Sequence, residues 1–249
     1  MKEANSPCPD SGFFAVAIDG PAGVGKGTLA KELAEALNFI YVDTGALYRA
    51  VALYCIGENV SPDNANQVES VLPGAVISVE CENNTQRVML NGMDVTEALR
   101  SPEVSNASSK VAAIPAVREK LLSIQRDMAA GKNVVMEGRD IGARVLPYAQ
   151  VKIYLDASLN ERARRRFSER AAIGIKTELK AIINELGERD LRDARREHSP
   201  LTQARDAVLI DSTHMGQRQV TEAALVIIHE KTGGLHGIPN SKNTALCDL

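Results

Sequence analysis

Residues 18–28 form a glycine-rich stretch with one lysine, IDGPAGVGKGT, whose spacing suits the binding of phosphate. Glycines expose backbone N–H groups, and these form a cradle for anions at the start of a helix. The spacing from Gly20 to Lys26 is that of a P-loop, whose lysine bridges the β- and γ-phosphates of a nucleotide. The usual pattern places a Mg²⁺-binding Ser or Thr directly after the lysine. Here Gly27 takes that place, and the hydroxyl arrives one residue later at Thr28.

The segments on either side of the glycines support a P-loop. The apolar run FFAVAI (13–18) precedes them as a buried strand would, and TLAKELAEALNF (28–39) has the apolar spacing of a helix. Strand, glycine-rich turn and helix is the order that a P-loop requires. We therefore predict that one continuous segment binds the phosphates, namely Gly20, Pro21, Ala22, Gly23, Val24, Gly25, Lys26, Gly27 and Thr28.

Arginines are concentrated on two predicted helices beyond residue 160. They are Arg162, Arg164, Arg165, Arg166 and Arg170, then Arg189, Arg192, Arg195 and Arg196. Neighbouring acids could neutralise them as a charged face in solvent. Phosphates placed end to end nevertheless repel strongly, and guanidinium groups bind phosphate with two hydrogen bonds. We therefore predict that residues 162–198 form an arginine-rich lid that closes over the phosphates and excludes water.

Acidic residues end two further predicted strands. Asp43 opens the motif DTGALYR (43–49), and Glu137 opens EGRDIG (137–142). Because ligands bind beyond the carboxyl ends of parallel strands, both acids should lie at the ligand edge of the sheet. Either acid alone could equally cap a helix or lie in a loop. Together they favour a site in which Mg²⁺ is held through water by Glu137 or Asp43, with no direct protein ligand.

Strand-like and helical segments alternate along the chain. Strands are predicted at 40–43, 133–138, 150–156 and 207–213, and helices at 45–57, 103–130 (broken near Pro115), 159–172, 176–189 and 217–232. This alternation predicts an α/β fold with a parallel sheet covered by helices on both faces. Between residues 59 and 100, short β-like runs separated by Asn-Asn and Asn-Gly indicate a small antiparallel insertion. The predicted organisation is a core at 13–58 and 101–232, an insertion at 59–100, and flexible tails at 1–12 and 233–249.

The composition narrows the class of protein and its surroundings. A net charge of −3 gives no overall positive excess for nucleic acid or an anionic membrane. No apolar run approaches the ~20 residues that cross a bilayer, and the first residues lack the apolar core of a secretory signal. The four cysteines are scattered, without the spacing of a metal site or a disulfide framework. We therefore expect a cytoplasmic protein without nucleic-acid or membrane partners.

Five segments, taken in order, resemble those of the bacterial cytidylate kinases: GPAGVGKGT, DTGALYR, VRE, EGRDIG and ERDLRDARREHSPL. The resemblance runs from about residue 14 to 230 and implies a P-loop kinase with a nucleoside-monophosphate-binding (NMP-binding) insertion and a short helical lid. It implies a monomer that uses ATP and Mg²⁺ to phosphorylate CMP or dCMP. It also accounts for GKGT, in which Gly27 leaves room for Mg²⁺ held by phosphates and water. Thr28 then meets the α-phosphate.

The resemblance implies roles for individual side chains. The residues that would bind cytosine and the acceptor phosphate are Thr44, Tyr48, Arg49, Arg118, Arg139 and Asp140. Those that would contact the ribose are Ser109, Arg189 and Asp193. Those that would act on the transferring phosphoryl group are Lys26, Arg162, Arg166 and Arg196. Asp140 and Arg139 would read the base edge. Arg49 and Arg118 would bind the acceptor phosphate. Two positions depart from the family's pattern, since Glu137 stands where Asp is frequent and Ala143 where Thr often follows DIG.

Other interpretations stay open at the level of sequence. The chain could be a P-loop kinase for another small acceptor, such as UMP, AMP or shikimate. It could be an ATP-binding switch protein without metabolic turnover, although DTGALYR and the arginines would then lack a purpose. RNA binding by the same arginines is disfavoured by the acidic balance and by aromatic residues at only 4%.

Overall fold

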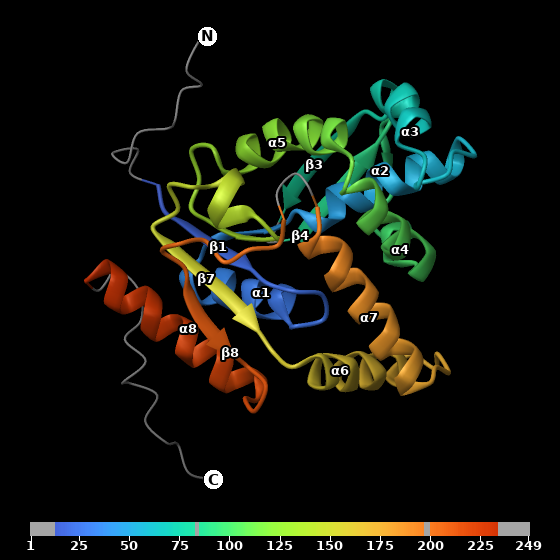
Figure 1. Cartoon of the computed structure of the whole chain (residues 1–249). Helices are drawn as coiled ribbons and strands as arrows, with labels where there is room; N and C mark the ends of the chain where they lie inside the picture. The colour runs from blue at the N-terminus through green and yellow to red at the C-terminus, as the bar shows by residue number, and fades with distance from the viewer. Residues whose placement is uncertain (1–12, 83–84, 197–199, 234–249) are drawn as a thin grey trace.

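Five parallel strands form the central sheet, in the order β2-β6-β1-β7-β8 (Figure 1). The computed structural model describes residues 13–82, 85–196 and 200–233, so the predicted tails lie outside the described residues except for Gly233. The strands are β1 (Ala15–Asp19), β2 (Ile40–Asp43), β6 (Val134–Glu137), β7 (Val151–Asp156) and β8 (Val208–Asp211). The predicted parallel sheet is thereby confirmed, with every strand within a few residues of its expected place.

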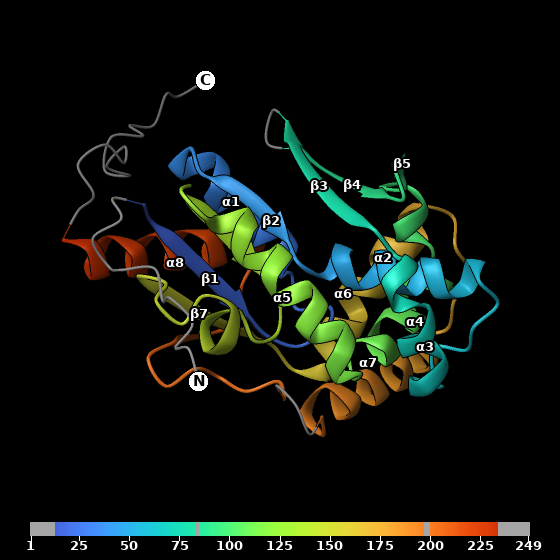
Figure 2. The same ribbon diagram turned by 90° about the horizontal axis from the view of Figure 1, so that it is seen from above.

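Helices cover both faces of this sheet, as Figures 1 and 2 show. Side chains alternate across a strand, so Ala15 and Ala17 pack into one hydrophobic core while Val16 and Ile18 pack into the other. The first core is completed by α2 (Gly45–Gly57), α4 (Pro102–Val111) and α5 (Pro115–Ala129), and the second by α1 (Lys26–Leu37) and α8 (Gln217–Thr232). The predicted break at Pro115 is confirmed, because this proline starts α5.

The turn between β1 and α1 brings the backbone close to a neighbouring strand. At Gly20, φ is 152°, and a Cβ there would lie 2.0 Å from the carbonyl oxygen of Leu155 in β7. At Gly25, which precedes the first helical residue, φ is 98°. Both positions therefore need glycine, one for close approach and the other for its left-handed backbone.

A second, antiparallel sheet forms within the predicted insertion. Its strands are β3 (Ile77–Glu82), β4 (Thr85–Leu90) and β5 (Met93–Asp94), with short 3₁₀ helices at Leu72–Gly74 and Ala98–Arg100. The sequence prediction missed α3 (Ala65–Val71), which Asn64 caps by accepting a hydrogen bond from the Gln67 N–H at 3.2 Å. That cap was a local signal for a helix start.

One side-chain amide of the small sheet completes the edge of the large one. Gln86 Oε1 accepts from the Asp43 N–H at 2.8 Å, and Gln86 Nε2 donates to the Asp43 carbonyl at 3.0 Å. β2 is an edge strand of the parallel sheet, so its last residue would otherwise present unpaired backbone groups. Gln86 thus attaches the insertion to the point where DTGALYR begins.

The two predicted arginine-bearing helices are α6 (Leu159–Ala172) and α7 (Leu179–Ala194). They pack together against the P-loop, where Ala22 shares a small hydrophobic cluster with Ala163, Ile182 and Leu186. α7 continues five residues past the predicted end at 189, because the sequence that follows contains no glycine or proline. No helix in the part of the chain that the structure describes is long and apolar enough to cross a membrane.

Gly20→Ala should destabilise the fold severely, since its Cβ would collide with the Leu155 carbonyl, which belongs to the sheet and has no room to move. We expect a loss of more than about 4 kcal/mol in the free energy of unfolding, measured by urea denaturation. Gly57→Ala, at the end of α2 with nothing within 4 Å, is the control and should change stability by less than about 1 kcal/mol. Equal effects of the two changes would contradict this account.

Candidate active site

A cavity of about 340 Å³ opens at the carboxyl ends of β1, β2 and β6. This is the edge at which open parallel sheets bind ligands. Most of the predicted site residues line it: Ala22, Gly23, Gly25, Lys26, Gly27, Thr28, Asp43, Thr44, Tyr48, Arg49, Ser109, Arg118, Glu137, Arg139, Asp140, Arg166, Arg189, Asp193 and Arg196. The structure therefore brings together, from seven separate segments, side chains that were grouped by motif and resemblance in the sequence.

Lys26 lies buried at the centre of the P-loop, as the first residue of α1. Its Nζ donates to the carbonyl of Pro21 at 2.8 Å, which folds the side chain back over the loop. Burial, followed by the nearby charge of Arg139, lowers the pKa of Lys26 to about 7. The amine is therefore held in a place where an incoming anion would strongly favour its protonated form.

Glu137 occupies the space in front of Gly27, the residue after the lysine. A Cβ on Gly27 would lie 2.8 Å from Glu137 Oε1. The same oxygen accepts from the Tyr41 hydroxyl at 2.9 Å, and burial raises the pKa of Glu137. The side chain that a usual P-loop carries at position 27 is thus replaced by a carboxylate from β6.

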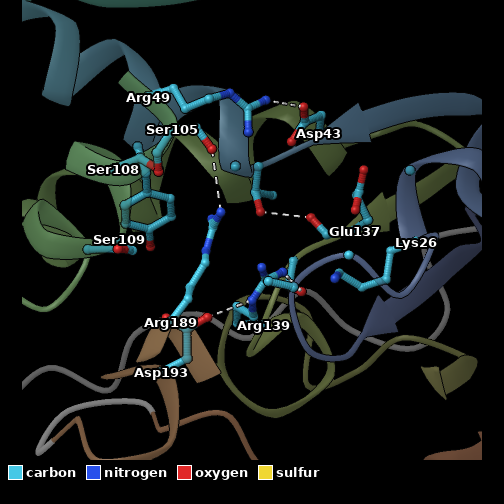
Figure 3. A pocket seen from close by; sticks show the side chains of 18 of the residues that line it. Lys26, Asp43, Arg49, Ser105, Ser108, Ser109, Glu137, Arg139, Arg189 and Asp193 are labelled. Atoms are coloured by element: carbon cyan, nitrogen blue, oxygen red, sulfur yellow. Dashed lines mark hydrogen bonds and ion pairs between the residues drawn. The ribbon is translucent and has the colours of Figure 1, made fainter. Parts of the chain in front are cut away.

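The DTGALYR segment places four polar side chains at the cavity wall. Arg49 Nη2 lies 2.5 Å from Asp43 Oδ2, and both side chains are about one-quarter exposed (Figure 3). Thr44 Oγ1 donates to the Glu137 carbonyl at 2.7 Å, which joins the ends of β2 and β6. The Tyr48 ring lies 5.6 Å from the Arg118 guanidinium, close enough for a cation–π contact.

Arg118 and Asp140 form a buried ion pair at the cavity floor. Arg118 Nη1 also donates to the Ala112 carbonyl at 3.2 Å, while its Nε has no partner among the described residues. Asp140 directly precedes a short π-helix (Ile141–Val145), so its position depends on how that turn is held. Ala143, the second departure from the family's pattern, lies within the same turn.

α7 contributes an acid between arginines. Asp193 accepts from Arg139 Nε at 2.9 Å and from Arg196, and Arg189 extends across the pocket to Ser105 Oγ at 3.5 Å (Figure 3). Burial alone would raise the pKa of Asp193, but Arg139 and Arg196 lower it overall. The longer α7 makes this cluster possible, because Arg189 and Asp193 lie one helical turn apart.

Positive and negative side chains nearly balance around the cavity. Among the described residues its lining contains seven lysine or arginine and six acidic side chains. Several of the cations are already paired with carboxylates, as Arg49, Arg118 and Arg139 show. A phosphate that binds here would exchange places with a carboxylate as the partner of an arginine.

Four predicted residues, Gly20, Pro21, Val24 and Arg162, do not line this cavity. The three from the P-loop shape its backbone. Arg162 is buried beneath the loop, where its Nη1 donates to the Ala22 carbonyl at 2.9 Å and contacts Asp190 at 2.6 Å. Arg166, one turn later, does reach the cavity and pairs with Glu169 at 3.0 Å. The two arginines therefore have different surroundings.

A second cavity, which no sequence motif predicted, lies on the other side of the P-loop. It measures about 390 Å³ and shares Gly23, Gly25 and Thr28 with the first. Its apolar lining comes from distant segments: Leu29, Leu155, Met215 and Val220. Ser105 and Ser108 of α4 were also missed, although SNASS (105–109) repeats serine at helical spacing. No local sequence pattern marks the second cavity, because the residues that line it are spread over nearly 200 positions of the chain.

Comparisons with known proteins identify the family of this chain. The cytidylate kinase family model matches residues 16–230. A cytidylate kinase of Leuconostoc mesenteroides is 48% identical over 80% of this chain and 89% of its own length. Those of Caldanaerobacter subterraneus (46%) and Caldicellulosiruptor saccharolyticus (43%) each cover 88% of this chain and 96% of their own. The matched range includes the P-loop, every residue that lines the cavity, and α6 and α7, and the chain belongs to the cytidylate kinase family.

Proposed function

We propose that this protein transfers the γ-phosphoryl group of ATP to CMP or dCMP, giving ADP and CDP or dCDP. Family membership supports the choice of substrates. The observation that carries the proposal is that two cavities meet at the P-loop and share its residues Gly23, Gly25 and Thr28. A donor in one and an acceptor in the other would have their phosphates adjacent, which is what transfer between two nucleotides requires.

The second cavity suits the base and ribose of ATP. Leu29, Leu155 and Val220 provide an apolar lining that a purine ring can pack against. Arg165 forms part of the lining, and its guanidinium donates to the Ser212 carbonyl at 2.6 Å and to Val24 O at 3.3 Å. These bonds tie the P-loop to the turn before α8 and hold the base pocket at a fixed distance from the phosphates.

The first cavity suits the cytidine nucleotide. Cytosine presents an amino donor beside ring acceptors, a pattern that a carboxylate and an arginine can read together. In the proposal Asp140 and Arg139 take these roles. Uracil offers a carbonyl in place of the amine and would meet the Asp140 carboxylate unfavourably. The ribose would lie near Ser109, Arg189 and Asp193, with Thr44 and Tyr48 closing the wall of the cavity.

Charge stabilisation and positioning account for the transfer step. Arg49 and Arg118 would orient an oxygen of the acceptor phosphate for in-line attack on the γ-phosphate. That oxygen is already ionised, so no strong general base is needed. Lys26, Arg166 and Arg196 would stabilise the charge on the transferring group. Arg162, buried under the P-loop, would instead hold α6 and α7 in place for this contact.

The oxygen atoms of Glu137 and Asp43 suit Mg²⁺ held through water. Oxygen ligands are those that Mg²⁺ prefers, and it usually keeps several waters. Glu137 lies against the space that a Cβ on Gly27 would fill, beside the loop that would hold the phosphates. When bound, Mg²⁺ would neutralise charge on the β- and γ-phosphates. The two carboxylates would orient its waters, and Tyr41 would orient Glu137.

The insertion would act on the acceptor site indirectly. Among the described residues, none from 59–100 lines the first cavity. Gln86 nevertheless bonds the backbone of Asp43, whose carboxylate holds Arg49. In the proposal, residues 59–100 form the NMP-binding insertion and residues 162–198 form the lid. The protein would be a monomeric, cytoplasmic enzyme with small-molecule substrates.

A panel of acceptors tests the proposal as a whole. With ATP as donor, ADP release should be fastest with CMP and dCMP and slower with UMP, AMP and shikimate. Preference for UMP, AMP or shikimate would point to another kinase. ATP binding without any acceptor-dependent ADP release would support the switch protein instead.

Asp140→Ala should erode the discrimination between cytosine and uracil. Loss of one well-placed base contact costs about 1–3 kcal/mol, so the kcat/KM ratio of CMP to UMP should fall roughly ten- to hundredfold. Steady-state kinetics with both acceptors measures it. Asp127→Ala, an exposed acid on α5 outside the cavity, is the control and should leave the ratio unchanged. An unaltered ratio in Asp140→Ala would refute base reading by this residue.

ATP binding at pH 8 should be accompanied by uptake of about one proton. Lys26 has its pKa lowered to about 7, so its amine is mostly neutral at pH 8 until phosphate restores its charge. Titration calorimetry in buffers of different ionisation enthalpy measures the uptake. Lys26→Met should abolish it and the exposed Lys132→Met should not. A binding enthalpy independent of buffer in the unmodified protein would contradict this assignment.

A further inference from the structure

Asp19 is a buried carboxylate to which the proposed mechanism gives no role. It ends β1 immediately before the P-loop, and 4% of its surface is exposed. It does not line the acceptor cavity, so it would not touch the substrate. Within the part of the chain that the structure describes, no lysine or arginine forms an ion pair with it. Lys26 acts on Asp19 only through its charge, and Lys152, which lies beside Gly142, is bonded to Asp206 and to the Pro147 carbonyl.

Both oxygens of Asp19 are bonded to the turn that follows Asp140. Oδ1 accepts from the Ile141 N–H at 2.8 Å, and Oδ2 accepts from the Gly142 N–H at 2.8 Å. These two N–H groups begin the π-helix Ile141–Val145 and have no carbonyl partner inside it. The first strand thus caps a turn 122 residues away, and that turn begins next to Asp140.

Burial makes Asp19 a costly way to cap a turn. It raises the pKa of Asp19 to about 6, an effect that the two backbone hydrogen bonds reduce and that the charge of Asp140 increases. Lys26 offsets it weakly. A neutral amide or hydroxyl could cap the turn without the desolvation of a charge. A carboxylate differs in accepting with both oxygens at once, which fixes two successive N–H groups rather than one.

We propose that Asp19 is a positioning residue for base recognition, holding the Asp140 turn in register with the strand that leads into the P-loop. Through this clamp the acceptor base site and the donor phosphate site share one strand, β1. The inference rests on the proposed role of Asp140 in reading cytosine. Gly142 leaves room for the clamp, because a Cβ there would lie 3.0 Å from Lys152 Cδ and 3.5 Å from Asp19 Oδ2.

A double-mutant cycle tests whether Asp19 acts through Asp140. Asp19→Asn keeps the size of the side chain but leaves one acceptor oxygen for two donors. It should raise KM for CMP by about tenfold while KM for ATP changes less than about twofold. In the Asp140→Ala background the same change should have less than about a twofold effect on KM for CMP, because the group it positions is gone.

Each outcome of the cycle has a distinct meaning. An equal factor from Asp19→Asn in both backgrounds, or an equal rise in KM for ATP, would overturn the inference and leave the function of Asp140 intact. No effect of Asp140→Ala on KM for CMP or on cytosine selectivity would overturn the base-reading proposal and, with it, this inference.

Two further variants serve as a control and as a replacement. Asp211→Asn is the matched control, since Asp211 also ends a strand and accepts a backbone N–H, that of Thr213 at 2.9 Å, but lies outside the cavity. It should leave both KM values unchanged. If Asp19→Asn does not fold, Asp19→Ser replaces it under the same criteria, because serine is smaller and still accepts one hydrogen bond.

Discussion

Repulsion among the cations that line the first cavity constrains the rest of the structure. A protein that brings two phosphate chains together must hold arginines close to one another before either chain arrives. In the structure each of three acids faces them: Asp43 holds Arg49, Asp140 holds Arg118, and Asp193 lies between Arg139 and Arg196. Two of these acids come from the ends of parallel strands or the turns after them, and one from α7. The carboxyl ends of the strands and α7 must therefore lie close together, so that the acids of both can reach the arginines.

These ion pairs also reduce the free energy gained when a phosphate binds, because each arginine must first leave its carboxylate. An arginine that leaves a carboxylate for a phosphate exchanges one charged partner for another, so its net gain is smaller than that of a free guanidinium. In return the side chains are held near their working positions, which reduces the entropy lost on binding. Helix α6 follows the same principle, because Arg162 is fixed under the P-loop while Arg166 remains partly exposed at the cavity.

The sequence predicted the architecture well where a local signal marks each boundary. β2, α2 and α8 match their predicted limits, because Asp43, Gly57 and Gly233 stand at or beside the ends of apolar patterns. Tertiary contacts decided what the sequence could not show. Arg162 and Arg166 lie one turn apart on α6 and look equivalent in the sequence, but only packing of the P-loop against α6 separates their surroundings. Asp19 likewise carried no signal of its own, because its partners are 122 and 123 residues away.

The contact between Gly27 and Glu137 gives the evolution of this loop a preferred order. A side chain at position 27 would place its Cβ 2.8 Å from the Glu137 carboxylate, which Tyr41 holds in place. An aspartate at 137 would be one methylene shorter and would withdraw the carboxylate from that space. A lineage with this chain's sequence could therefore gain a P-loop serine most easily after shortening the acid, and the reverse order would pass through a crowded intermediate. In this chain the absence of a side chain at Gly27 leaves room for the Glu137 carboxylate as well as for phosphate.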